Sequence, residues 1–149
     1  MAEEISLYNF ETGQNVLTKK INEISGWPHT SEKLGENYAL IGGMVKLYLI
    51  DLTNLNIINQ IENFQNESIL YYNGYIFSGG ISNDEVKIIQ YKFKEEEKTL
   101  EKISELKLKN IIDGACEIVF LKKEKYLTLF ISSRHPSNNC PINIYCYDN

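Results

Sequence analysis

The residues that could carry chemistry in this chain gather in two short stretches. Trp27 and His29 lie in GWPHTSEK, and Arg134 and His135 lie in SSRHPSNNCP. Tryptophan and arginine are frequent at the energetic centres of protein interfaces, and a loop histidine can also act as a general acid or base. These four residues are therefore the predicted binding site. An enzyme that uses one of the two histidines is the alternative.

A metal site or a catalytic carboxylate has little support elsewhere in the sequence. His135 and Cys140 could supply half of a structural zinc site, but such a site needs four ligands, and no Cys-x-x-Cys or His-x-x-x-His pattern supplies the others. Paired carboxylates can do acid–base work when one is desolvated, whereas the run Glu95, Glu96 and Glu97 stands among lysines, as a solvated turn does. The sequence therefore predicts no catalytic residue, no metal and no cofactor.

The overall composition limits the classes of partner. The 149 residues are 43% hydrophobic and carry a formal charge of −5, which is ordinary for a globular domain and argues against a nucleic-acid partner, since such a protein needs a concentrated basic surface. No stretch reaches the ~20 apolar residues of a membrane span, and the first residues do not have the pattern of a signal peptide. Three cysteines do not form a disulfide framework. We predict a cytoplasmic protein with no membrane partner.

A strand-like phrase recurs along the chain and indicates how these loops are positioned. It reads ISLYNF from Ile5, VKLYLIDL from Val45, VKIIQYKF from Val86 and INIYCYD from Ile142, at intervals of 40, 41 and 56 residues. Repeats of about 40 to 50 residues are typical of β-propeller blades, in which each unit is one small sheet. The sequence therefore predicts an all-β protein of successive sheets.

The alternation within the phrase favours strands that are covered on both sides. In VKLYLIDL, Val45, Leu47 and Leu49 face one way, and the intervening residues, which include Tyr48 and Ile50, face the other. Both sets are largely apolar, as expected for a sheet that lies between two neighbours.

Turn signals divide the chain into units of four-stranded antiparallel meanders. Asn73-Gly74 is a strong hairpin signal because both residues accept positive φ, and the glycine pairs Gly42-Gly43 and Gly79-Gly80 are expected to end their strands. The segment from Lys94 to Lys109 could form a surface helix, but we favour a charged turn followed by an edge strand. The predicted boundaries give one propeller segment over 1–149, divided into a partial unit 1–22, a unit 23–64, a unit 65–109 and a partial unit 110–149.

The second and third units resemble the WD40 repeat. The segment SILYYNGYIFSGGISNDEVKIIQYKF is similar to a WD40 blade, and in YALIGGMVKLYLIDL Asp51 matches the aspartate of the Trp-Asp pair, with Ile50 at the tryptophan position. A strand that ends in Gly-Gly also looks like the kelch repeat, and this rival stays open. Either resemblance implies an incomplete β-propeller of about three blades.

The sequence thus predicts a noncatalytic WD40-like repeat protein that acts as a protein–protein interaction scaffold or as a subunit of a larger assembly. Closed propellers have about four to eight blades, so we expect further blades, a second copy or another subunit to complete this one. The alternative is an enzyme built on a propeller scaffold that uses a histidine in a loop at the propeller mouth.

Overall fold

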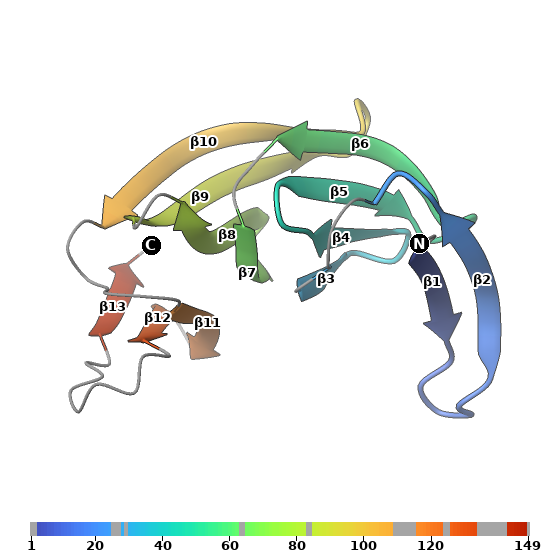
Figure 1. The fold of residues 1–149 in the computed structure, drawn as a ribbon, viewed down its shortest axis with the longest axis horizontal. Helices are drawn as coiled ribbons and strands as arrows, with labels where there is room; N and C mark the ends of the chain where they lie inside the picture. The colour runs from blue at the N-terminus through green and yellow to red at the C-terminus, as the bar shows by residue number, and fades with distance from the viewer. Residues whose placement is uncertain are drawn as a thin grey trace.

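The protein is all-β in the part that the structure describes. The computed structural model describes residues 3–24, 28, 30–62, 65–82, 85–108, 116–123, 126–133 and 143–148, and these ranges contain thirteen strands and no helix. The strands form four separate antiparallel sheets, each built from consecutive strands (Figure 1). The predicted all-β class and the antiparallel meanders of the two central sheets are confirmed. No closed ring of sheets is formed by the described residues.

The first sheet is a two-stranded hairpin. It pairs β1 (Glu3–Tyr8) with β2 (Asn15–Ile21), and the register shifts at Leu7 and Tyr8, where the strand leads into the turn. This pair of strands lies within the predicted partial unit 1–22.

The second sheet is a four-stranded meander in the order β3-β4-β5-β6. Its strands are β3 (Thr30–Leu34), β4 (Tyr38–Gly42), β5 (Lys46–Asp51) and β6 (Asn56–Glu62). In β5, four consecutive residues are buried because both faces of the strand are covered, as the double apolar alternation predicted.

The third sheet repeats this topology in the order β7-β8-β9-β10. Its strands are β7 (Gln65–Tyr72), β8 (Tyr75–Ser82), β9 (Glu85–Lys94) and β10 (Thr99–Leu108). The strand β10 lies at the edge of the sheet and follows a turn of charged residues, so the preference for an edge strand over a helix is confirmed.

The last sheet is three-stranded, in the order β11-β12-β13. Its strands are β11 (Cys116–Lys123), β12 (Tyr126–Ser133) and β13 (Asn143–Asp148).

The sheets follow one another in an arc (Figure 1). The strands β6 and β10 lie on its convex side, and β3, β7 and β11 lie toward the concave side. In addition, β7 contacts β3 on one side and β11 on the other, so the first strands of three successive sheets are neighbours.

Two apolar clusters hold the second sheet between its neighbours. Leu47 and Leu49 of β5 pack with Ile69, Ile76 and other residues of the third sheet. The alternate residues of the same strand pack toward the first sheet, in a cluster formed by Tyr48, Ile50, Leu55, Ile21 and Ile24. The two-residue period of β5 thus assigns each side chain to one of two cores.

The turns after β1 and β5 have the same construction. In one, Gly13 donates its backbone N–H to the Asn9 carbonyl, and in the other Leu55 donates to the Asp51 carbonyl, at 2.8 and 2.7 Å. Both donors have positive φ, 68° and 55°. The side chains of Asn9 and Asp51 each accept a hydrogen bond from a backbone N–H within the turn. The hairpin β1–β2 is therefore the local equivalent of β5–β6.

One glycine prediction is wrong. The pair Gly79-Gly80 was expected to end its strand, but β8 continues through both residues to Ser82, and each is paired with β9. The pair Gly42-Gly43 does end β4. The same dipeptide has two outcomes because pairing with a neighbouring strand, rather than glycine itself, decides where the strand stops.

The predicted Asn73-Gly74 turn is confirmed, with φ of 49° and 80° at the two residues. A Cβ added at Gly74 would meet no atom within 4 Å, so only backbone strain opposes a larger residue there. We expect Gly74→Ala to lower the free energy of unfolding by about 1 kcal/mol. Urea denaturation at constant pH measures this loss, and an unchanged value would contradict the assigned turn.

Candidate functional site

The predicted binding residues Trp27, His29, Arg134 and His135 all lie outside the described residues. They stay a prediction, and the geometry of the described part identifies other surfaces that the sequence did not indicate.

One groove on the described surface lies between the end of β1 and the β3–β4 hairpin. It has a volume of about 560 Å³ and is called the edge groove below. Residues from β1, β3, β4 and the β5–β6 turn line it: Leu7, Tyr8, Ser31, Glu32, Lys33, Glu36, Asn37, Ala39, Leu52 and Thr53. The side chain of Tyr8, which lines the groove, is 59% exposed.

A second groove of about 280 Å³ lies on the other side of the β3–β4 turn. It shares Glu36 and Asn37 with the edge groove, and Tyr38, Tyr71 and Phe93 supply its aromatic lining. The rings of Tyr38 and Phe93 meet edge to face with their centroids 5.2 Å apart, so this groove lies over the junction of the second and third sheets.

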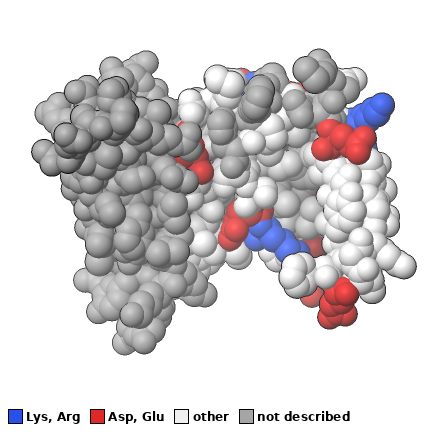
Figure 2. Space-filling view, turned by 60° about the horizontal axis from the view of Figure 1, so that its bottom comes forward, with Lys and Arg blue, Asp and Glu red and all other residues white. Residues whose placement is uncertain are grey.

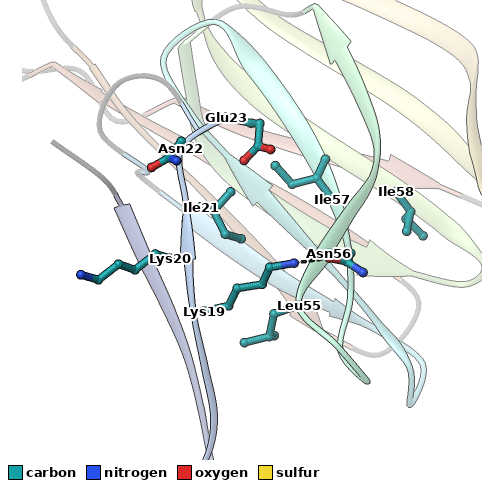
Figure 3. A pocket seen from close by; sticks show the side chains of 9 residues that line it. All are labelled: Lys19, Lys20, Ile21, Asn22, Glu23, Leu55, Asn56, Ile57 and Ile58. Carbon is teal, nitrogen blue, oxygen red and sulfur yellow. Dashed lines mark hydrogen bonds between the residues drawn. The ribbon is translucent and has the colours of Figure 1, made fainter.

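The third groove, of about 410 Å³, separates β2 from β6 (Figure 3). The side chain of Lys19 crosses it and donates a hydrogen bond to the Asn56 side chain, while Lys20 points away. Leu55 forms part of its floor and is fully buried. Since its one inward-pointing lysine already has a protein partner, this groove is better explained as the junction of two sheets than as an anion site.

Charge is spread over the described part of the face drawn in Figure 2 rather than concentrated in one patch. Figure 2 shows acidic side chains at several places on this face, with basic side chains beside some of them. Among the described residues, four groups have a perturbed pKa. Hydrogen bonds from Thr53 lower the pKa of Asp51, and a hydrogen bond to Glu101 raises that of Lys94. Burial raises the pKa of Tyr91 to about 12.

The fourth group is Glu105, whose pKa is lowered by Lys102 and then by Lys107. None of these four groups lines any of the three grooves.

The ion pairs of Glu105 predict a small acid dependence of stability. Its folded pKa lies below the ordinary 4.5, so the stabilisation is complete above that pH and is lost as the pH falls through the folded pKa. We expect Glu105→Gln to cost less than about 1 kcal/mol at neutral pH, because the partners are largely exposed. The difference from the wild type should vanish in strong acid.

Urea denaturation at a series of pH values measures this dependence. The matched control is Glu96→Gln, which removes the same charge in the exposed β9–β10 turn. A difference that grows as the pH falls would contradict a lowered pKa of Glu105 in the folded state.

Asn66, the first residue of the sequence triplet Asn66-Glu67-Ser68, is fully buried. Its side chain donates to the carbonyl oxygens of Gly43 and Lys46, at 3.0 and 3.2 Å, and accepts a hydrogen bond from the Ser78 hydroxyl at 2.6 Å. The triplet has the pattern of a glycosylation site, but a buried and bonded amide cannot carry a glycan in the folded state.

Metal-binding clusters and membrane-spanning helices were also sought in the described ranges. These ranges contain no group of three or more His, Cys, Asp or Glu residues that could hold a metal ion. They also contain no helical segment with the length and apolarity of a membrane span. A scan against protein-family models gives no match to this chain, and a search of curated proteins gives no similar sequence.

Sequence reasoning missed the edge groove for a clear reason. Its lining comes from separate segments of the chain, and its mixture of polar, small and apolar side chains has no distinctive spacing. The one usable signal was the incomplete first unit, because a unit with fewer strands covers less of the sheet beside it.

Proposed function

We propose that this chain is a noncatalytic WD40-like repeat protein whose sheets are propeller blades. It acts as a protein–protein interaction scaffold or as a subunit of a larger assembly. The rigid sheets present turns and loops, and such segments carry recognition in many folds.

One observation carries this proposal: the first strands of three successive sheets are neighbours. In the described part, β7 lies between β3 and β11, and the outer strands β6 and β10 lie on the convex side (Figure 1). Propeller blades stack in this way around a central axis. The burial of both faces of β5 supports the same arrangement, since an internal blade is covered on both sides.

The partner in this proposal is a protein. Further blades, a second copy of the chain or another subunit completes the arc, because an open arc leaves strand edges and blade faces without neighbours. The described residues on the face drawn in Figure 2 form no concentrated basic patch, which supports a protein partner over a nucleic acid.

Light scattering on the purified native particle tests the proposal. We expect a mass well above the 17.2 kDa of one chain, with either copies of the chain or a stoichiometric protein partner in the particle. A folded monomer that persists at low micromolar concentration and binds no protein would contradict it.

The histidine variants His29→Ala and His135→Ala separate this function from the enzyme alternative. Under the proposal, both variants leave the fold intact and neither removes a chemical activity. Loss of a turnover reaction with protein binding retained would favour the enzyme instead.

A further inference from the structure

We propose that the unpaired edge of β1 and the edge groove beside it bind an extended segment of a partner polypeptide, which adds to β1 as a β-strand. The segment alternates apolar and basic residues. This inference rests on the proposed interaction function and specifies the site and the chemistry of the partner.

The backbone of β1 is available on one side. Among the described residues, β1 pairs only with β2. An unpaired strand edge presents a row of N–H and C=O groups, and an extended peptide can satisfy them by adding a strand.

The neighbouring sheet shows which position is empty. The β1–β2 hairpin and the β5–β6 hairpin have equivalent turns, from Asn9 to Gly13 and from Asp51 to Leu55. In the second sheet the edge of β5 that faces away from β6 is occupied by β4. At the corresponding edge of β1 no described strand is present. A strand bound there would stand to β1 as β4 stands to β5, and would run antiparallel to it.

Part of the second-sheet face that such a strand would cover already packs against the first sheet. The β1–β2 sheet packs on Ile41, Ile50 and Ile57 of the second sheet. The edge groove begins at Leu7 and extends past Ala39, and no residue of β2 lines it. The groove therefore continues an established sheet-to-sheet interface beyond the free edge of β1.

The exposure of β3 shows that this part of the face is open. Ser31 and Lys33, which lie on one face of β3, are exposed. On the other face Thr30 and Glu32 are partly buried, and Leu34 is buried against the third sheet. Small side chains such as Ala39 and Ser31 leave room for apolar side chains of an incoming strand.

The charge around the groove favours a basic segment. Glu36 and one cation, Lys33, line it, and the exposed Glu4 stands on β1 itself. The carboxylate of Glu32 accepts a hydrogen bond from the Tyr71 backbone N–H of the third sheet. Among the described residues of the groove and of the adjoining β1 edge, acidic side chains therefore outnumber basic ones. Lysine or arginine in the bound strand would meet complementary charge, which favours encounter and register.

Fluorescence anisotropy with three labelled octapeptides tests the proposal on the full chain. One peptide alternates valine and lysine, the second alternates valine and glutamate, and the third is the lysine peptide with alternate backbone amides N-methylated. We expect the lysine peptide to bind and the other two to bind at least about tenfold more weakly, because they lack the charge or the backbone donors. Equal binding of the lysine peptide and its methylated form would overturn strand addition.

Substitutions in the protein locate the site. The double variant Glu4→Lys and Glu36→Lys should weaken the lysine peptide roughly fivefold at low salt. The matched control Glu96→Lys, in the β9–β10 turn and outside the lining of the edge groove, should leave it nearly unchanged. An equal loss in the control would mean nonspecific attraction to an acidic protein and would overturn the proposal.

Amide hydrogen exchange tests strand addition separately from charge, because charge attraction alone would not protect the backbone amides of β1. Saturating lysine peptide should slow exchange in β1, from Glu3 to Tyr8, and leave β10, an edge strand of the third sheet, unchanged. Protection of β10 in place of β1 would overturn the site. A dimer of the chain that excludes the peptide would assign the groove to a second copy and overturn the stated occupant.

The failure of this inference is distinguishable from failure of the proposed function. If the native particle is larger than one chain but no peptide binds, only the strand-addition site is wrong. A lone monomer without peptide binding would contradict both.

Discussion

Asn66→Leu is expected to lower the free energy of unfolding by about 3 kcal/mol, because it removes three buried or partly buried hydrogen bonds at one position. The Asn66 amide bridges the third sheet to the turn between β4 and β5, where it donates to the Gly43 and Lys46 carbonyls. Leucine has a similar size but can replace none of these bonds. The Ser78 hydroxyl, itself fully buried, would lose the acceptor that it now has 2.6 Å away.

Asn59→Leu is the matched control for this prediction. It makes the same substitution at the same pair of sheets, where the Asn59 amide donates to the Lys98 carbonyl at 3.2 Å in an exposed position. We expect a loss below about 0.5 kcal/mol, since water can replace an exposed bond. Urea denaturation compares the two variants, and similar losses would show that burial of Asn66 does not matter.

A double-mutant cycle isolates the bond between Asn66 and Ser78. We expect Asn66→Ala and Ser78→Ala to be nonadditive by about 1 kcal/mol or more, because the two side chains share one buried network. Additive losses would contradict a direct interaction.

Gly42→Ala is the second large effect, with an expected loss of about 3 kcal/mol. A Cβ at this position would lie 2.7 Å from the Asn66 Cβ and 2.8 Å from the Thr30 methyl group. The first of these atoms is attached directly to the β7 backbone, so relief requires the two sheets to move apart. The lack of Cβ at Gly42 thus permits the close approach that the Asn66 bonds need.

Two comparisons test this explanation. Gly74→Ala introduces strain without any collision and should cost about 1 kcal/mol, so Gly42→Ala should be clearly worse. Thr30→Ser removes one of the two colliding atoms, and in that background Gly42→Ala should cost less than in the wild type. A stabilising effect of Gly42→Ala, as an ordinary strand glycine would show, would contradict the packing described.

The two predictions concern the same junction, and this has a consequence for the proposed function. Asn66 stands at an irregularity of the β7–β8 register, between Asn66 and Ser68. Such bulges change the direction of a side chain, and here the amide of Asn66 contacts the preceding sheet. The second and third sheets are therefore joined by a specific polar contact as well as by apolar packing, which suits a rigid scaffold.

The part of the fold that the sequence predicted depends on short-range physics. The two-residue alternation around Tyr48 and Ile50 and the Asn73-Gly74 hairpin follow from backbone geometry and from the apolar or polar nature of neighbouring residues. These terms act within a few residues, so the pattern alone specifies them. The residues chosen for the binding site, Trp27, His29, Arg134 and His135, stay a prediction.

The sequence by itself determined the strands, most turns and the succession of small antiparallel sheets. Only the tertiary structure decided that Gly42 ends a strand while Gly79 does not, that the Asn66 amide is buried, and that a groove lies beside the free edge of β1. The physical reason is that these features depend on atoms from segments far apart in the chain. Local patterns specify which residues pair within a sheet, whereas close approach between sheets specifies which polar groups are buried and which edges remain open.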